Sequence, residues 1–326
     1  MADTERASVS AGARLHFGFT TLSTEHDRLY GSLGVALADP RVTVTATPAD
    51  AVVCPDVVAD SVRRTVDALG VSGARVELTE TLPRHVGLGS GTATALATTA
   101  AIARAYDRRP RVRERAPVLD RGRRSGIGVA AFEGGGFVLD AGRSTDTCGT
   151  PSRTPPSDGS WTVPPVVARY PVPPAWRFVL VVPDADPGRC GDAEATSMQT
   201  AIADADPETG ERIAGLVTSR VLPAIVAGDA AAFGAAVTEI GRLNGTWYAD
   251  EQDGVYRPPV DALVDTLLAD DAITGAGQSS WGPVAYGVTT TAERDAARAA
   301  GERALDRAGV TGDVRLVAPQ NCGALR

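Results

Sequence analysis

The pattern of apolar and polar positions changes its period several times along the chain. Near the start, alternating or β-branched segments at Ala13–Phe19 and Val42–Thr47 predict strands, as does the glycine-spaced apolar run Tyr30–Leu37. Apolar residues at helical spacing then predict a helix over Asp56–Leu69 that ends at a glycine. A further strand is expected at Val76–Leu82. The first part of the chain therefore combines several strands with a helix.

The middle of the chain is rich in small residues and then in proline. The stretch that ends at Tyr106 is dominated by alanine and carries little bulk on any side, so we expect a buried helix there. Gly126–Asp140 predicts a short helix, a glycine turn and a strand. Residues 149–175 contain many prolines, and we interpret them as a linker or a long surface excursion.

The second half of the chain begins with an apolar strand and is then mainly helical. Strands are predicted at Arg177–Pro183, Val284–Thr289 and Asp313–Ala318, and Ile273–Gly282 is interpreted as a glycine-rich break. The predicted helices are Ala193–Ala203, Glu208–Ala227, Ala230–Leu243, Asp261–Asp270 and Ala292–Ala308. Strands and helices mix without strict alternation, which favours the α+β class.

Length and composition limit the number of domains and the class of protein. A chain of 326 residues suggests about two domains, which we place at residues 1–160 and 161–326. With 43% apolar and 22% charged residues, the composition is typical of a soluble globular protein. No apolar run is long enough to cross a bilayer and no signal peptide is visible. We therefore expect no membrane contact and a cytoplasmic location.

The charged residues exclude several kinds of site. All 32 basic residues are arginines, so a Walker-type lysine, a Schiff-base lysine and a lysine general base are excluded. The net charge of -8 argues against a general nucleic-acid binder. The four cysteines and three histidines are far apart and do not have the spacing of a zinc site.

A glycine-dense turn stands immediately before the alanine-rich helix. Glycine accepts a positive φ and leaves room beside the backbone, so the N–H groups of Gly87, Gly89 and Gly91 can converge. The N-terminus of the helix adds free N–H groups and the positive end of its dipole, and the hydroxyls of Ser90 and Thr92 add further donors. The turn predicts a cradle for phosphate or pyrophosphate. The alternative is a turn that only caps a buried helix.

Longer motifs indicate a family. The segment PRHVGLGSGTATALA resembles the phosphate loop of the GHMP kinase superfamily, with Gly91 where that pattern has a second serine. The RRSGIG and AAFEGGGFVLD motifs between residues 123 and 140, QSSWGP at 278–283, and ARLH at 13–16 resemble the β-ribofuranosylaminobenzene 5′-phosphate synthase family. The resemblance covers nearly the whole chain. It implies an N-terminal domain like ribosomal protein S5 and a ferredoxin-like C-terminal domain.

The resemblance implies a reaction as well as a fold. Enzymes of this family condense phosphoribosyl pyrophosphate with 4-aminobenzoate or 4-hydroxybenzoate, form a C-riboside, and release CO₂ and pyrophosphate, an early step towards tetrahydromethanopterin-type pterins in archaea. Mg²⁺ is expected with the pyrophosphate, and ATP is not consumed. Dimers are common in the superfamily, so a homodimer is an expected assembly. The alternatives are an ATP-dependent GHMP kinase for a small molecule, disfavoured by QSSWGP and the lack of lysine, and a relative that binds a phosphate ligand without catalysis.

Within this hypothesis, a second anion site and a carboxylate are needed. Arginine forks bind phosphate in a bidentate way, so the sugar 5′-phosphate is expected at a site made by Arg123, Arg124, Ser125, Gly126 and Gly128. Asp140 is the first candidate for the catalytic carboxylate and for a Mg²⁺ ligand, and Glu133 is the second. The alternative for Asp140 is a structural role, in which it caps the turn that follows it.

The benzoate needs a flat apolar pocket and a partner for its carboxylate. Trp281 and Phe132 are candidates to flank the ring, and Arg14 or His16 to meet the carboxylate. The alternative for each aromatic residue, and for the pair Trp247-Tyr248 in a loop-like region, is simple packing. The expected substrate-binding residues are Arg14, His16, Gln278, Ser279, Ser280, Trp281 and Gly282.

Overall fold

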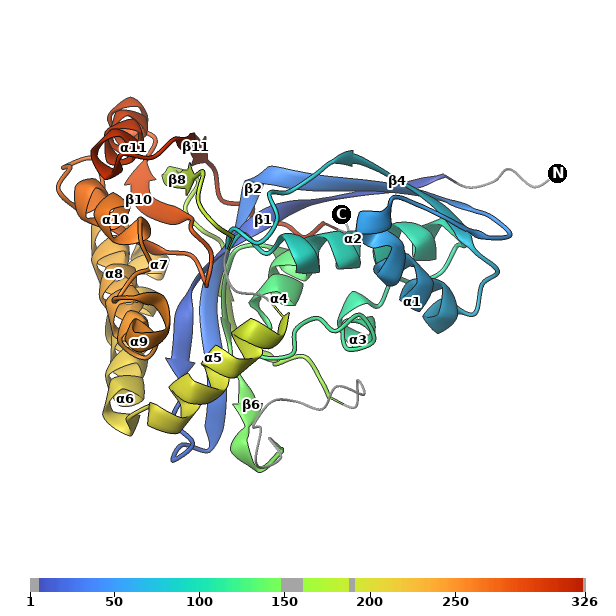
Figure 1. Cartoon of the computed structure of the whole chain (residues 1–326), viewed down its shortest axis with the longest axis horizontal. Helices are drawn as coiled ribbons and strands as arrows, with labels where there is room; N and C mark the ends of the chain where they lie inside the picture. The colour runs from blue at the N-terminus through green and yellow to red at the C-terminus, as the bar shows by residue number, and fades with distance from the viewer. Residues whose placement is uncertain (1–5, 148–160, 188–190, 325–326) are drawn as a thin grey trace.

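The computed structural model describes residues 6–147, 161–187 and 191–324, which form two sheets and the helices packed on them (Figure 1). The first sheet is built around one very long strand. Its order is β3 (Val52–Val53), β4 (Ala74–Glu80), β2 (Arg28–Pro48), β5 (Phe137–Asp140) and β7 (Val166–Tyr170), and β1 (Ala7–Thr21) and β6 (Arg143–Ser144) also pair with β2.

The antiparallel pair β1 and β2 extends through both halves of the molecule (Figure 1). The two segments expected as separate strands, Tyr30–Leu37 and Val42–Thr47, are both parts of β2. Where they meet, the backbone of β2 also bonds to the end of the chain: the Ala38 N–H donates to the Ala318 carbonyl and the Gln320 N–H donates to the Ala36 carbonyl.

The helices of the first half confirm the helical predictions. α2 (Ser90–Ala105) contacts β1 and β2, and Leu96, Ala97 and Ala100 are fully buried. Because alanine is small, the helix lies close to the strands, as its composition predicted. The remaining elements of this half are the 3₁₀ turn η1 (Asp56–Val58), α1 (Ala59–Leu69), α3 (Val112–Arg115), α4 (Ile127–Gly134) and the 3₁₀ turn η2 (Thr145–Thr147).

The second sheet has the order β11 (Gly312–Val317), β8 (Trp176–Pro183), β10 (Ala285–Thr290) and β9 (Gly275–Gln278), with every neighbouring pair antiparallel. In chain order this is 4-1-3-2, the order of a ferredoxin-like sheet, which confirms the expectation for this half. Side chains alternate between two faces. Val179 and Val181 pack with the buried residues of α10 (Val260–Leu268) and α11 (Arg294–Ala308). Phe178 and Leu180 belong to the main core.

The helices of the second half, except the short α9, lie in the segments where the apolar periodicity predicted helices. The segment expected as one helix from residue 208 to 227 is interrupted by a π-helical turn, η3 (Val217–Val221). The helices are α5 (Gly191–Asp204), α6 (Pro207–Leu216), α7 (Leu222–Ala227), α8 (Ala230–Thr246), α9 (Ala249–Gln252), α10 (Val260–Leu268) and α11 (Arg294–Ala308). Among the described residues, none of the helices is long and apolar enough to span a membrane.

Two segments contain strands that the sequence analysis did not predict. The predicted glycine-rich break contains the edge strand β9, because Gly275 and Gly234 bring the strand and α8 into backbone contact; a Cβ on Gly275 would lie 2.1 Å from the Gly234 carbonyl oxygen. The predicted surface excursion also contains a strand. Residues 149–160 lie outside the described residues, but β7 pairs with β5. The β-branched pair at its start was hidden among prolines.

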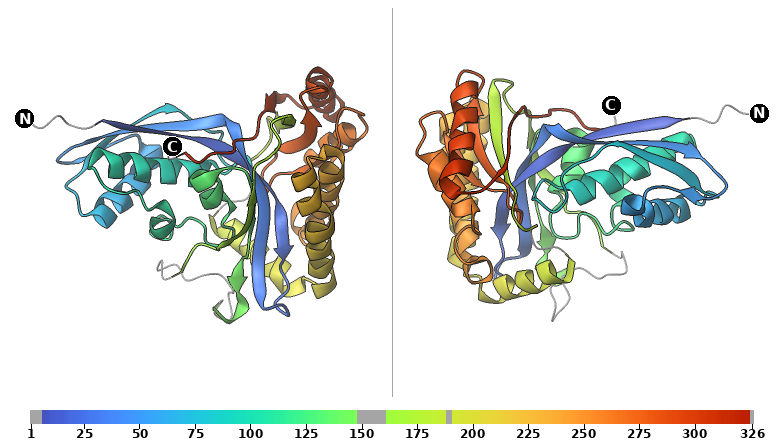
Figure 2. Two further views of the ribbon diagram at one scale, coloured as in Figure 1. Left: turned by 180° about the vertical axis from the view of Figure 1, so that it is seen from behind. Right: turned by 45° about the horizontal axis from the view of Figure 1, so that its top comes forward.

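The end of the chain packs against the first sheet (Figure 2). Gly135 and Gly136 have φ values of +65° and +76°, and a Cβ on Gly135 would lie 2.4 Å from the Gln320 carbonyl oxygen. The GGG motif therefore provides room for the returning chain. The division at residue 160 stays a prediction, and both β7 and the last residues of the chain lie on the first sheet.

The loop-like interpretation of residues 244–246 is wrong, and the reason is one side chain. α8 continues to Thr246, and Asn244 lies beside the free edge of β1. Its Oδ1 accepts from the Phe19 N–H at 2.7 Å, and its Nδ2 donates to the Phe19 carbonyl at 3.0 Å. One amide thus satisfies both backbone groups of an edge residue, as a neighbouring strand would.

We expect Asn244→Ala to destabilise the fold by about 2 kcal/mol, because two partly buried backbone groups of Phe19 lose their partner. Urea unfolding measures this. The control is Thr246→Ala, two residues further along the same helix and exposed, which should change stability by no more than about 0.5 kcal/mol. Equal stability of the two variants would contradict a role of Asn244 at the strand edge.

Candidate active site

Three segments that are far apart in the sequence meet at the carbonyl of Gly87. Arg14 on β1 donates to this carbonyl from Nη1 at 2.5 Å, and its backbone N–H donates to Leu88 at 3.1 Å. The Ser279 hydroxyl donates to the Gly87 carbonyl at 2.8 Å and accepts from the His16 N–H at 3.2 Å. The structure therefore brings together the ARLH, GLGSG and QSSWGP motifs.

The glycines at this junction allow the segments to touch. Gly87 has a φ of +96°, and a Cβ there would lie 2.1 Å from the Ser279 carbonyl oxygen. A Cβ on Gly282 would lie 2.0 Å from the backbone of Val86. These two glycines, expected to contact ligands, serve the packing of the loop. Gly89, with a φ of +76°, is instead the N-cap of α2 and faces the Arg14 side chain.

The N-terminus of α2 has the properties of an anion site. Among the described residues no side chain caps it, Ser90 is buried, and Gly91 is exposed. A cavity of about 100 Å³ lies against Ser90, Gly91 and Thr94, and its other walls include Arg84 and Arg121. An anion can therefore enter beside the helix dipole and two guanidinium groups.

Arg121 is a cation at this cavity that the sequence reasoning did not assign to it. Its Nε is buried and has no hydrogen-bond partner among the described residues, and burial lowers the pKa of its guanidinium below the usual value. Its Nη2 lies 3.7 Å from the position of a Cβ on Gly91. The signal in the sequence was the arginine-rich run, but the run does not reveal which member points towards α2.

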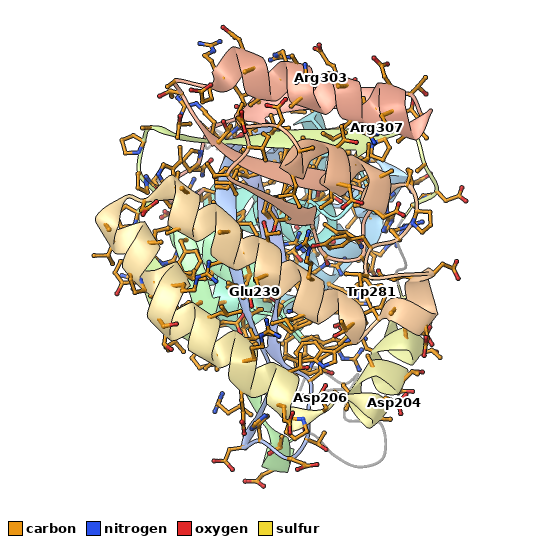
Figure 3. All side chains as sticks on the ribbon, turned by 90° about the vertical axis from the view of Figure 1, so that its left-hand side faces the viewer. Asp204, Asp206, Glu239, Trp281, Arg303 and Arg307 are labelled. Atoms are coloured by element: carbon orange, nitrogen blue, oxygen red, sulfur yellow. The ribbon has the colours of Figure 1, made fainter. Side chains whose placement is uncertain are left out.

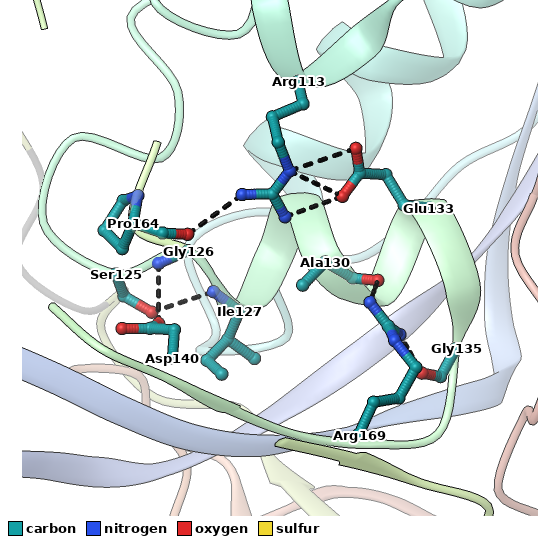
Figure 4. Close-up of polar contacts among 10 residues, drawn as sticks. All are labelled: Arg113, Ser125, Gly126, Ile127, Ala130, Glu133, Gly135, Asp140, Pro164 and Arg169. Atoms are coloured by element: carbon teal, nitrogen blue, oxygen red, sulfur yellow. Dashed lines mark hydrogen bonds and ion pairs between the residues drawn. The ribbon is translucent and has the colours of Figure 1, made fainter. Parts of the chain in front are cut away.

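The proposed second anion site lies at the N-terminus of α4. Gly128 packs against Thr92, with 3.1 Å between the Thr92 methyl group and a Cβ on Gly128, so the N-termini of α2 and α4 are neighbours. However, the Gly126 N–H already donates to Asp140 at 2.8 Å, and the Ile127 N–H donates to the Ser125 hydroxyl at 3.2 Å (Figure 4). The protein itself therefore caps this helix.

The arginines of the same motif lie outside that cap. Arg123 forms an ion pair with Asp120 at 3.9 Å. The assignment of Arg123, Arg124 and Ser125 to a sugar phosphate stays a prediction, and in this geometry it depends on the two guanidinium groups rather than on the Gly126 N–H.

Asp140 is buried, with 2% of its surface exposed. Its Oδ2 accepts from the Ser32 hydroxyl at 2.5 Å and from the Gly126 N–H, and its Oδ1 accepts from the Gly142 N–H at 2.8 Å. Burial raises the pKa of this carboxyl, and the hydrogen bonds act in the opposite direction. The contacts are those of a structural carboxylate that caps α4 and the following turn, the alternative considered above.

The same contacts bear on the expected metal. Three hydrogen bonds already use most of the lone pairs of Asp140, two on Oδ2 and one on Oδ1, so little of this carboxylate is left for a Mg²⁺ ion. The role of Asp140 as a Mg²⁺ ligand stays a prediction. Within the described ranges no group of three or more histidine, cysteine, aspartate or glutamate side chains could hold a metal ion.

Glu133 lies at the opposite end of α4 from the Asp140 cap (Figure 4). Arg113 donates to its Oε2 from Nη2 at 2.7 Å and from Nε at 2.9 Å, and to its Oε1 from Nε at 3.2 Å. Beside it, Arg169 donates to the Ala130 carbonyl at 2.9 Å and to that of Gly135, at the last turn of the helix. The structure does not bring the two candidate carboxylates together.

An aromatic pocket opens beside the junction at Gly87. Its lining includes His16, Gln278, Ser280 and Trp281, four of the expected substrate-binding residues, together with Phe19, Asn244, Tyr248, Gln252 and Tyr256. The Trp281 and Tyr248 ring centroids are 4.4 Å apart, and Trp281 lies beside α8 and α9 (Figure 3). Phe132, expected to flank the ring, is packed in the main core instead.

His16 is a neutral wall of this pocket. It is 5% exposed, and its ring meets that of Phe19 edge-on at 5.1 Å. Burial and, to a smaller extent, the positive charge of Arg14 lower the pKa of His16 to about 3. At neutral pH the imidazole is uncharged, so it can share a hydrogen bond with a ligand but brings no positive charge.

The buried histidine should make stability depend on pH. The unfolded state takes up a proton on His16 below about pH 6.5, whereas the folded state takes it up only near pH 3. The free energy of unfolding therefore decreases as the pH is lowered from about 6.5 towards 3. We expect His16→Gln to lack this dependence, with a difference of about 3 kcal/mol between the two profiles at pH 4 relative to pH 7. Urea unfolding from pH 7 to pH 4 measures it; parallel profiles would contradict the assignment.

Comparisons with known proteins agree with the fold. The family described as GHMP kinases N terminal domain matches residues 56–136. A homoserine kinase from Cytophaga hutchinsonii (TM-score 0.64, 19% identity, 99% of this chain and 98% of that one) and a mevalonate pyrophosphate decarboxylase from Streptococcus pyogenes (TM-score 0.66, 11% identity, 98% of each chain) share the fold.

Curated relatives are closer in sequence. The beta-ribofuranosylphenol 5'-phosphate synthase of Methanothermobacter thermautotrophicus is 32% identical over 86% of this chain and 88% of its own length. The protein of the same name from Archaeoglobus fulgidus is 31% identical over 85% and 86%. With that identity along most of both chains, and with the three motifs joined at one carbonyl, the chain belongs to the beta-ribofuranosylphenol 5'-phosphate synthase family.

Proposed function

We propose that this protein joins phosphoribosyl pyrophosphate to a para-substituted benzoate, with loss of CO₂ and pyrophosphate. The observation that carries the proposal is the link between an uncapped, arginine-flanked helix N-terminus and an aromatic pocket, made by Arg14 and Ser279 on the Gly87 carbonyl. The link connects the proposed anion site to the proposed site for a flat ring through one loop. A reaction between a sugar diphosphate and an aromatic acid requires both kinds of site.

The diphosphate is proposed to lie at the N-terminus of α2. When the bond between ribose C1 and the diphosphate oxygen breaks, its electron pair passes to the leaving group. The Ser90–Thr92 N–H groups, the helix dipole, Arg84 and Arg121 are placed to stabilise that charge. Mg²⁺ remains a proposal, as an ion that accompanies the diphosphate; no step is assigned to it.

The benzoate is proposed to lie in the aromatic pocket with its carboxylate towards His16; Arg14, the other expected partner of the carboxylate, is not among the residues that line this pocket. Ring C1 forms the new bond to ribose C1. The bond from ring C1 to the carboxylate carbon then breaks, its electron pair restores the aromatic ring, and CO₂ leaves. An uncharged His16 suits this step, because a cation there would hold the carboxylate in place.

The pocket must widen to admit a ring. Its volume is about 50 Å³, whereas a cavity that takes benzene is about 150 Å³. Trp281 is also a wall of a neighbouring cavity of about 270 Å³ that is lined by Arg257 and Glu251. We propose that the Trp281 side chain moves towards this cavity when the benzoate enters.

Two other functions remain as alternatives. A GHMP kinase would use the same anion site for ATP, but the relatives that match most of the chain are named as synthases. A relative that binds without catalysis would keep the cradle and lose turnover. A homodimer and a cytoplasmic location stay predictions.

The first test follows the leaving groups. With phosphoribosyl pyrophosphate, Mg²⁺ and carboxyl-labelled 4-hydroxybenzoate or 4-aminobenzoate, we expect labelled CO₂ and pyrophosphate in equal amounts. The control omits phosphoribosyl pyrophosphate and supplies ATP. Hydrolysis of ATP without labelled gas would favour the kinase, and binding of both substrates without gas would favour the non-catalytic relative.

The second test examines the cradle. We expect Gly89→Val to lower kcat/KM at least 100-fold, because its side chain would meet Arg14 beside the N–H groups of α2. The matched control is Gly309→Val: Gly309 has a similar φ of +67° and nothing within 4 Å. Both variants should lose about 1–2 kcal/mol of stability from the left-handed backbone, but only the first should lose activity. Full activity of Gly89→Val would remove the cradle from the mechanism.

A further inference from the structure

Two tyrosine hydroxyls are buried without a hydrogen-bond partner among the described residues. They belong to Tyr256, which is 8% exposed, and to Tyr286, which is fully buried. Buried hydroxyls without partners are rare, because leaving one unsatisfied destabilises the folded state. Each of the two therefore needs an explanation, and their surroundings differ.

Tyr256 is a wall of the aromatic pocket, and Tyr286 is not. The Tyr256 hydroxyl lies beside Gly241 of α8, 3.2 Å from the position of a Cβ there, and Gly241 lines the same pocket. The Tyr286 hydroxyl lies under β9, 2.8 Å from the position of a Cβ on Gly277, and the Tyr286 ring packs edge-on against Phe17 in the main core.

The pocket has a near side and a far side relative to the phosphate loop. His16 and Ser280 form the near side. The Ser280 N–H donates to the His16 carbonyl, and the Ser279 hydroxyl accepts from the His16 N–H and donates to Gly87 of the loop. Tyr256 forms the far side, because it is also a wall of the outer groove between α8 and α10, which contains no residue of the loop. Burial raises the pKa of Tyr256 to about 12, so at neutral pH the phenol keeps its proton.

We propose that the Tyr256 hydroxyl binds the para substituent of the acceptor benzoate and thereby selects benzoates that carry a hydroxyl or an amino group at that position. The inference rests on the proposed function. A carboxylate on the near side places the para position of the ring on the far side. A tyrosine hydroxyl both donates and accepts, so it can pair with either substituent. A benzoate without such a substituent leaves the buried hydroxyl without a partner, as it is in this structure among the described residues.

The experiment compares two ligands across matched variants of the whole chain. Calorimetric titration measures the Kd of 4-hydroxybenzoate and of unsubstituted benzoate. We expect the wild type to prefer 4-hydroxybenzoate about tenfold. Tyr256→Phe should bring the ratio of the two Kd values close to one by weakening 4-hydroxybenzoate alone. Tyr286→Phe, which removes the other unpaired hydroxyl from outside the pocket, should leave the ratio unchanged.

A second variant tests the same contact without removing the hydroxyl. Gly241→Ala places a methyl group beside it and should weaken 4-hydroxybenzoate more than benzoate. An unchanged ratio of the two Kd values in Tyr256→Phe would overturn the inference. The hydroxyl would then be explained by a bond to a buried water, and the proposed reaction would be unaffected. If the wild type binds neither benzoate, even with phosphoribosyl pyrophosphate present, the proposed acceptor itself is wrong and the inference falls with it.

Discussion

The carbonyl of Gly87 accepts hydrogen bonds from two side chains that arrive from opposite ends of the sequence. Arg14 comes from the first strand and Ser279 from the end of β9, and the Ser279 hydroxyl also holds the backbone of His16. The position of the glycine loop is thus fixed by both halves of the molecule. Gly87 lines neither cavity, but α2 begins three residues after it at Ser90, and His16 and Ser280 of the aromatic pocket adjoin the residues that are bonded to it.

The same region shows how the chain uses carboxylates and glycines for architecture. Asp140 accepts from Ser32, Gly126 and Gly142, so one buried charge fixes a strand, the start of α4 and a turn. The hydrogen bonds to its ionised form offset only part of the desolvation, because burial still raises the pKa of the carboxyl. The ion pair of Arg113 and Glu133 holds the other end of α4.

Much of the fold was predictable from the sequence, because apolar periodicity reports burial directly. The buried alanine helix, the strand–helix order of the second half and the helix–turn–strand of Gly126–Asp140 followed from local pattern alone. Predictions failed where a distant contact decides the structure. In its local sequence Asn244 predicts a loop, but it ends up in a helix because its side chain pairs with the backbone of Phe19. Gly275 predicts a break, but it lies in a strand because it packs against the backbone of Gly234.

The candidate site follows the same division. The anion cradle was visible as a motif, since consecutive residues make it. The aromatic pocket is lined by residues of β1, α8, the α9–α10 segment and β9. Because these segments are far apart in the sequence, no local sequence pattern indicates that Tyr256 lines the pocket. Side-chain direction was equally hidden: Asp140 faces N–H donors, and among neighbouring arginines Arg121 faces the cavity.

The contacts of β2 with the last residues have a consequence for how the chain acquires its structure during synthesis. Leu37 bridges to Pro319, which lies 282 positions further along the sequence (319 minus 37). The ribosome must therefore synthesise the chain as far as Pro319 before the middle of that strand finds this partner. Until then this stretch of β2 lacks the partner, and its final ordering waits for the residues around Pro319 to be translated.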